Sequence, residues 1–381
     1  ARHCFTVCGG EVMATPKLRF DGFSGNWVTT QLGNVCSFTQ GVQIPQSEQI
    51  NEERNGYIRY LYIRDFFSDK FKCYVPNIYP EKIIHPHEIM MVNTGNTTGE
   101  AYTGRYGVLS NNSFKISYDL AHFNDQFMYL FCSSELAQNQ IKKFFNAGGQ
   151  PHLGHKNISQ ILISYPKKEE QTKIASFLSA VDEKISQLTQ KHELLSQYKQ
   201  GMMQKLFSQQ IRFKADDGSE FGEWEEIALG KIKGVSIASG KSSHEKLELA
   251  KYYYYGSTGV IGYSNEYDYQ GTRILIARVG HNAGYIYMVS GQYNVSDNTL
   301  ILELPSNLDY IFIRAFLEKF QLNKLVFGTG QPLITGSLLK KVVIQVPCLE
   351  EQTKIANFLS AIDQKIYNFV YFIEETKQWK K

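Results

Sequence analysis

Two stretches of the sequence place apolar residues at alternating steps of four and three. This spacing puts them on one face of an α-helix, and its seven-residue repeat is typical of a coiled coil. Pro166 precedes the first stretch, and Glu169 and Glu170 fall in its first turn, where the helix dipole favours acidic residues. His192 and Lys199 also fall on the seam, where polar residues set register. The seam residues that we predict are Ile174, Leu178, Val181, Ile185, Leu188 and Leu195 in the first helix and Ile355, Leu359, Ile362, Ile366, Phe369 and Ile373 in the second.

The two stretches are copies of each other. Residues 169–185 and 350–366 are identical at 14 of 17 aligned positions with a constant offset of 181, and the same offset places Pro166 on Pro347. A duplicated seam most simply packs on its own copy, so we predict an antiparallel pair of helices around a pseudo-two-fold axis. A helix over residues 169–207 would be about 57 Å long at 1.5 Å per residue, which is enough to hold two domains apart.

A second, shorter repeated motif marks the start of each unit. Arg19-Phe20 followed by Trp27 corresponds to Arg212-Phe213 followed by Trp224. From the tryptophan to the proline before the helix, the first interior spans 139 positions and the second 123, and the two share little recognisable sequence. One scaffold with two different interiors is suited to presenting two different binding surfaces to a bipartite target.

Both interiors alternate short apolar runs with Gly, Asn, Ser and Pro, which is typical of strands joined by turns. We predict strands at 82–85, 89–93, 271–279 and 299–303, and one helix near the end of each interior at 125–145 and 309–327. The predicted fold class is therefore α+β: two globular α+β domains separated by two long helices that form an antiparallel coiled coil.

This reading divides the chain into five segments. They are a tag, remnant or disordered segment at 1–16, a first globular domain at 17–165, a first helix at 166–210, a second globular domain at 211–346 and a second helix at 347–381. Lys381 aligns with Gln200, so we expect the second helix to be short, without the counterpart of residues 201–207.

Composition narrows the function. A length of 381 residues suggests two or three domains. The net charge of +3 permits contact with a polyanion but is too small for indiscriminate coating of nucleic acid, so any such contact is expected to be local. No apolar run is long enough to span a bilayer. The 6 cysteines form no CxxC pair, which suits free thiols in a reducing cytoplasm.

The motifs of catalysis are missing or imperfect. No Pro-Pro occurs, so the Asn/Asp-Pro-Pro-aromatic loop of adenine methyltransferases is absent. Gly234 and Gly240-Lys241-Ser242 enclose five residues where a phosphate-binding loop needs four. His85-Pro86-His87-Glu88 is read as a surface turn rather than a metal site, because no third ligand can be named. We expect no catalytic residue and no metal in this chain.

The repeated helix motif Pro-x-x-Glu-Glu-Gln-x-x-Ile-Ala-x-Phe-Leu-Ser-Ala-x-Asp-x-Lys-Ile, together with the Arg-Phe and Trp that start each unit, resembles the specificity subunit of type I restriction-modification systems. The resemblance covers nearly all of residues 17–381 and implies two target-recognition domains, each reading half of a split, asymmetric sequence in double-stranded DNA. It further implies that the helices dock two methyltransferase subunits and that restriction subunits join this core. S-adenosylmethionine, ATP and Mg²⁺ would then be bound by the partner subunits.

Loops rich in Arg, Asn, Ser and Thr are the best candidates for reading DNA, because these side chains match base edges and phosphates. The DNA-binding residues that we predict are Asn93, Thr94, Asn96, Thr97, Arg105 and Tyr106 in the first domain and Lys241, Tyr254, Arg278, His281 and Asn282 in the second. For any single residue the simpler interpretation is a polar loop without a ligand, whereas for each loop taken as a set we favour contact with DNA.

Three other functions fit the same features. The chain could be a free-standing sequence-specific DNA-binding regulator, the specificity subunit of a related methylase-nuclease fusion system, or a coiled-coil scaffold with two protein-binding heads. Co-purification with a methyltransferase separates the first from a specificity subunit, and salt-dependent DNA affinity excludes the scaffold.

Overall fold

The computed structural model describes residues 5–8, 11–14, 16, 18–145, 151–325 and 333–380. The chain divides into two compact units: unit 1 is Ala1–Ile185 with Thr376–Lys381, and unit 2 is Ser186–Glu375. Across the described residues, no helix is both long and apolar enough to cross a membrane.

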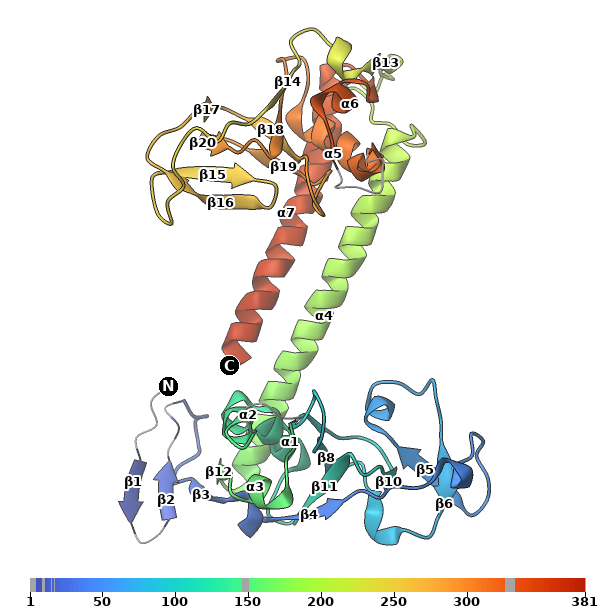
Figure 1. The fold of residues 1–381 in the computed structure, drawn as a ribbon, viewed down its shortest axis with the longest axis vertical. Coiled ribbons are helices and arrows are strands. Elements are labelled where there is room, and N and C mark those ends of the chain that lie inside the picture. The colour runs from blue at the N-terminus through green and yellow to red at the C-terminus, as the bar shows by residue number, and fades with distance from the viewer. Residues whose placement is uncertain are drawn as a thin grey trace. The chain divides into compact units, whose positions relative to one another are not determined.

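Unit 1 is built on two four-stranded sheets (Figure 1). The first is antiparallel, in the order β4 (Cys36–Gln40), β11 (Ser113–Tyr118), β8 (Ile89–Val92) and β9 (Ala101–Tyr102). The second has the order β6 (Tyr74–Pro76), β5 (Tyr57–Leu61), β10 (Gly107–Leu109) and β7 (Ile83–Ile84), with β5 and β10 parallel. Met128 and Ile141, from two helices, share one hydrophobic core with Met91, Phe114 and Ile116 of the first sheet.

The helix expected at residues 125–145 is in fact two helices, α1 (Asp125–Ser133) and α2 (Glu135–Lys142). Ser134 interrupts them because its backbone is extended (φ −68°, ψ 151°) and its Oγ accepts a hydrogen bond from the Ala137 amide at 3.2 Å. Serine is a favoured N-cap residue, so a new helix begins after Ser134, and the prediction of one continuous helix was wrong.

Unit 2 has the same arrangement (Figure 1). Its antiparallel sheet has the order β14 (Ser236–Ser239), β21 (Thr299–Glu303), β18 (Arg273–Ala277) and β19 (Ile286–Val289). Its second sheet has the order β16 (Gly259–Ser264), β15 (Tyr252–Gly256), β20 (Gln292–Val295) and β17 (Tyr269–Gln270), with β15 and β20 parallel. The helix expected at 309–327 is α5 (Tyr310–Phe320), which ends where Gln321 takes a left-handed conformation (φ 61°); residues 326–327 lie outside the described residues.

The remaining elements also correspond between the units. A two-stranded sheet joins the ends of each interior: β3 (Val28–Gln31) with β12 (Leu162–Tyr165) in unit 1, and β13 (Glu225–Ala228) with β22 (Val343–Val346) in unit 2. A short helix precedes the closing strand of each, α3 (His155–Ser159) and α6 (Gly336–Lys340). The duplication that the sequence shows at its edges therefore extends through both interiors as backbone structure. Unit 1 also contains a hairpin, β1 (Phe5–Cys8) with β2 (Glu11–Ala14), in the segment predicted to be a tag, a remnant or disordered.

The repeated stretches form the long helices α4 (Lys168–Phe207) and α7 (Leu349–Lys380). Each predicted seam residue is buried or half-buried. Within unit 2, the end of α4 shares a core with the first half of α7, through Leu206 and Phe207 against Ile355 and Leu359. Earlier in α4, the Lys199 ammonium lies 2.6 Å from an oxygen of Asp363, which comes later in α7. The two helices therefore run in opposite directions within unit 2, and Lys199 makes an ion pair across them.

The Glu-Gln pair of the repeated motif anchors each helix to its domain. Arg212 donates to both carboxylate oxygens of Glu351, at 3.1 and 2.8 Å, and this hydrogen bonding raises the pKa of Arg212. The fully buried Gln352 accepts from the Asp309 amide at 2.9 Å and donates to the Pro347 carbonyl at 2.9 Å. In unit 1 the same positions act alike: Arg19 pairs with Glu170, and Gln171 bonds to Asn124 and Pro166.

Candidate nucleic-acid interface

Directly after β4 and after β14, at Gly41 and Gly240, the chain leaves one sheet for the other, and we call this crossing point the turn. The Gly41 amide donates to the Ser113 carbonyl and the Gly240 amide to the Thr299 carbonyl, both at 2.9 Å. A Cβ at Gly41 would lie 2.0 Å from the Ser110 carbonyl oxygen, and one at Gly240 would lie 2.3 Å from the Ser296 carbonyl oxygen. Glycine is therefore required at both turns.

A buried tyrosine donates a hydrogen bond to the backbone of each turn. The Tyr60 hydroxyl donates to the Val42 carbonyl at 2.7 Å, and the Tyr254 hydroxyl donates to the Lys241 carbonyl at 2.9 Å. Tyr254 is fully buried, so the structure gives this predicted DNA-binding residue a supporting role. Lys241 itself is exposed at the surface of unit 2.

The two loops chosen from their composition are the same loop in the two units. Asn93 follows β8 and Arg278 follows β18, the equivalent inner strands of the two sheets, and their carbonyls accept from the Leu153 and Ile334 amides, both at 2.8 Å. Glycines with positive φ stand at matching places, Gly95 and Gly99 in unit 1 (φ 110° and 91°) and Gly280 and Gly284 in unit 2 (φ 75° and 94°). The backbone of the loop is therefore common to both units, and only its side chains differ.

Two of the four first-domain candidates in this loop form hydrogen bonds to other side chains. Asn93 is buried and its Oδ1 accepts from the Thr94 hydroxyl, which also lies 3.0 Å from His152 Nδ1. Thr97 is half-buried, whereas Asn96 is exposed at the tip of the loop. Asn96 is thus the residue of this set that is placed to touch a ligand.

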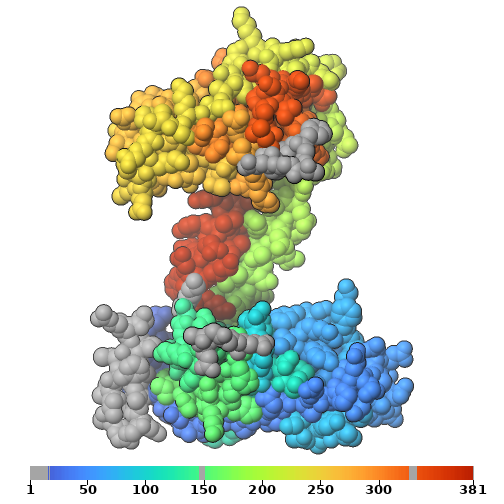
Figure 2. Space-filling model, in the orientation of Figure 1, coloured from blue at the N-terminus to red at the C-terminus, as the bar shows by residue number. Residues whose placement is uncertain are grey.

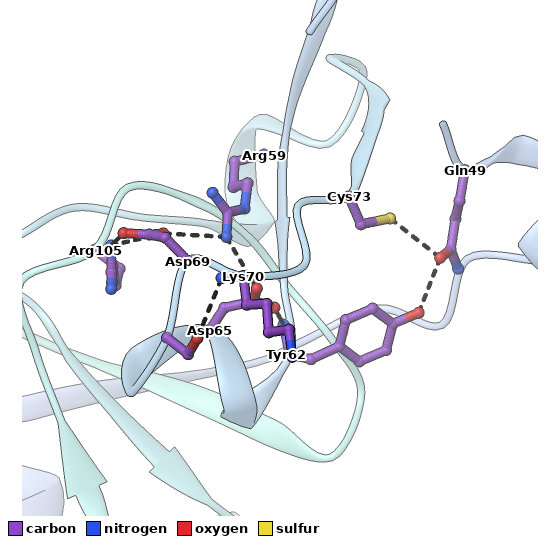
Figure 3. Close-up of polar contacts among 9 residues, drawn as sticks. Gln49, Arg59, Tyr62, Asp65, Asp69, Lys70, Cys73 and Arg105 are labelled. Carbon is purple, nitrogen blue, oxygen red and sulfur yellow. Dashed lines mark hydrogen bonds and ion pairs between the residues drawn. The ribbon is translucent and has the colours of Figure 1, made fainter. Parts of the chain in front are cut away.

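Arg105 belongs to an ion-pair network on the second sheet of unit 1 (Figure 3). Its Nη1 lies 3.0 and 3.1 Å from the two oxygens of Asp69, and the Arg105 hydrogen bond holds the pKa of that carboxyl below its usual value. Arg59 bridges Asp69 and the buried Asp65, at 3.4 and 2.9 Å. Arg105 therefore holds the loop that carries Asp69 in place, while its neighbour Tyr106 is 52% exposed.

Beside this network lies a cleft of about 1160 Å³, which our sequence reasoning missed. Gln49 is fixed at its wall, where its Oε1 accepts from the Tyr62 hydroxyl at 2.9 Å and from the Cys73 thiol at 3.2 Å (Figure 3). Amide and cationic side chains predominate among the polar residues that line the cleft: Gln43, Gln46, Gln49, Asn51, Asn111, Arg64, Lys70 and Lys72. The glutamine-rich run at 43–49 and the Lys-Phe-Lys at 70–72 are the signals that could have indicated it.

In unit 2 the equivalent loop and turn carry Arg278 and Lys241. Arg278 Nη1 donates to the Ser239 hydroxyl at 3.0 Å and to the Asp297 carbonyl at 3.2 Å, so the guanidinium is held beside the turn that carries Lys241. His281 is exposed, and with Asn282 it lines a separate cleft of about 540 Å³ against the end of α5. Figure 2 shows that the segment around residue 250, in yellow, forms part of the surface of unit 2.

The two motifs that suggested other chemistry have structural roles. Strand β14 occupies the stretch between Gly234 and Gly240, so these glycines do not frame a phosphate-binding loop. Glu88 is buried, and its carboxylate accepts from the His85 amide at 2.8 Å. No cluster of three or more His, Cys, Asp or Glu side chains in the described part of the chain could hold a metal ion.

The fold and these surfaces define a protein with two copies of one α+β domain, each joined to a long helix and each presenting a polar turn with different side chains. The chain belongs to the family of type I restriction modification DNA specificity domains, which matches residues 24–197 and 222–368. This finding confirms the resemblance indicated by the repeated helix motif, and with it the predicted two-domain α+β fold.

Named relatives agree with this family. The specificity subunit of the type I restriction enzyme MjaVIII from Methanocaldococcus jannaschii is 28% identical over 389 aligned positions, covering 90% of this chain and 87% of that protein. The EcoprrI specificity subunit from Escherichia coli is 23% identical and covers 74% of this chain and 72% of its own length. The crystal structure of the S subunit from M. genitalium has the same fold, with a TM-score of 0.63, 18% identity and 96% coverage of both chains.

Proposed function

We propose that this chain is the part of a type I restriction-modification complex that reads DNA, with each α+β domain reading one half of a split, asymmetric sequence. The observation that carries the proposal is that one backbone turn and one backbone loop occur twice with different side chains around them, Gln43 and Asn111 at the first copy and Arg278 and Asp297 at the second. Amides and guanidinium groups are the side chains that distinguish base edges in the major groove.

In this proposal the chain is not itself an enzyme. Methyl transfer and ATP-driven translocation belong to partner subunits, which bind S-adenosylmethionine, ATP and Mg²⁺. The long helices fix the spacing between the half-sites and dock two methyltransferase subunits, and restriction subunits join that core. A solved structure similar to this chain, with a TM-score of 0.58 and 18% identity, is described in connection with complex assembly of the type I system.

The outer face of α7 is the surface that we propose for docking. Tyr367, Val370 and Tyr371 are 66%, 44% and 55% exposed, and their spacing places them on one face of the helix, away from the seam. Aromatic residues that are exposed in an isolated chain are frequent anchors of protein interfaces.

Replacing Tyr371 by Glu is expected to weaken methyltransferase binding by about 2 kcal/mol or more, roughly 30-fold, because a charge would be buried at an aromatic anchor. Co-expression with the methyltransferase subunit and measurement of its recovery with this chain tests this expectation. Gln364→Glu, an exposed substitution on the same helix, serves as the control and should leave recovery unchanged.

The same co-purification, together with measurements of DNA affinity, separates the alternatives. A free-standing regulator would bind its DNA site tightly alone and retain no methyltransferase. A methylase-nuclease fusion as the retained partner would place the chain in that related system. A scaffold with two protein-binding heads would show no salt-dependent affinity for DNA.

A further inference from the structure

The hydrogen bonds of the two turns show which residue of unit 1 corresponds to which residue of unit 2 on the surfaces proposed to contact DNA. Ser110 and Ser296 are equivalent, because their amides donate to Leu61 and Tyr255, at 3.0 and 2.8 Å, in the same pair of parallel strands. Counting from these serines and from the turn glycines gives three equivalent pairs of positions, and the matching backbone hydrogen bonds of Asn93 and Arg278 give a fourth. They are Gln40 with Ser239, Gln43 with Ser242, Asn93 with Arg278, and Asn111 with Asp297.

In unit 1 these positions form an amide cluster. Gln40 Nε2 donates to the Asn111 carbonyl at 2.6 Å, and Asn111 Nδ2 donates to Gln43 Oε1 at 3.3 Å. Both Gln43 and Asn111 are exposed at the cleft, and within the described residues Gln43 Nε2 and Asn111 Oδ1 have no hydrogen-bond partner. The pair thus offers one donor and one acceptor, which matches the N7 acceptor and N6 donor of adenine.

In unit 2 the same positions form an arginine-carboxylate cluster. Arg278 is tethered through Nη1 to Ser239 and to the Asp297 backbone, which leaves Nη2 without a partner among the described residues. The Asp297 carboxylate accepts from the Ser242 hydroxyl at 3.0 Å through one oxygen. Arginine donors match O6 and N7 of guanine, and a carboxylate oxygen matches the N4 donor of cytosine.

A further detail indicates that Arg278 is kept for binding rather than for stability. Its Nε is buried without a hydrogen-bond partner in the part of the chain described, a cost that a folded protein normally avoids. Such local violations are expected at functional sites. The equivalent Asn93 is buried and bonded to Thr94, so the arginine is particular to the second domain.

We propose that the two halves of the target differ chemically at this equivalent point: Gln43 and Asn111 read an adenine in the half-site of the first domain, and Arg278 with Asp297 reads a G·C pair in the half-site of the second. This inference rests on the function proposed above and adds the base class that each domain selects.

The test is methylation mapping with the complete methyltransferase complex carrying wild-type chain, Arg278→Lys, Asn111→Ala or Arg273→Gln. Arg278→Lys keeps the charge but loses the Nη2 amino group, which the tethered guanidinium plane holds in a fixed direction, so discrimination for G·C at one position of one half-site should fall about 5- to 150-fold, while the other half-site stays unchanged. Asn111→Ala should relax one A·T position in the opposite half-site. Arg273 is the control: it begins β18, the strand that Arg278 follows, and it pairs with Glu303. Arg273→Gln should therefore leave the motif unchanged.

Three results overturn the inference while leaving the proposed function standing. They are a mapped motif with no G·C pair in the half-site affected by Arg278, equal weakening at all sequences, or relaxation of both half-sites by one substitution. If the wild-type complex instead methylates no interrupted motif, the proposed function itself fails, so the two failures are distinguishable.

Discussion

Replacing Glu351 by Ala is expected to lower the free energy of unfolding of unit 2 by about 3 kcal/mol. The carboxylate is fully buried and receives Arg212 and the Trp224 indole N–H, at 2.8 and 3.1 Å on the same oxygen. Removing it leaves a largely buried guanidinium without its partner, which costs more than the net contribution of the intact pair. Denaturant unfolding followed by tryptophan fluorescence measures the loss.

Glu350→Ala is the matched control, because Glu350 is exposed and lies in the same first turn of α7. Its loss should be limited to about 0.5 kcal/mol from the helix dipole. Equal destabilisation by both substitutions would show that the buried pair does not anchor the helix.

Replacing Phe207 by Ala is expected to cost about 3–5 kcal/mol of unfolding free energy, the usual range for truncating a buried phenylalanine. Phe207 ends α4 and is 1% exposed, with ring centroids of Phe312 and Phe316 at 5.4 and 5.5 Å. The cavity would therefore open where α4 enters the core of unit 2. Thermal or denaturant unfolding followed by circular dichroism reports the change.

Tyr198→Ala provides the comparison, because Tyr198 is an aromatic residue on the same helix with 50% of its surface exposed. We expect a loss near 0.5 kcal/mol at this surface position. Should the two substitutions cost the same, the end of α4 is not part of the core of unit 2.

The long helices and their motif were predictable because their signal is local and repeated. The three-four spacing of Ile355, Leu359 and Ile362 specifies a face directly, and all three are buried. The anchoring role of the Glu-Gln pair could not be predicted from the sequence, because Glu351 and Gln352 bond to Arg212 and Asp309, which lie far away along the chain. The proposed domain boundaries stay a prediction.

The surfaces proposed to contact DNA could be predicted from the sequence only in part. Loop composition led to Arg278 and Asn96, but a run of four tyrosines does not say which ones face inward, and Tyr254 proved to be buried. The common turn was missed because it is built from backbone hydrogen bonds at Gly41 and Gly240, which leave the surrounding side chains free to differ. The cleft lined by Gln43 and Asn111 joins segments distant in sequence, so no local pattern indicates it. Contact of the predicted residues with DNA stays a prediction.

Genome-wide mapping of methylated adenine, in a host that expresses the partner subunits with and without this chain, tests the central claim most directly. The account predicts one interrupted, asymmetric motif that is methylated only when the chain is present. Methylation that is the same in both hosts, or a motif without an interruption, would contradict it.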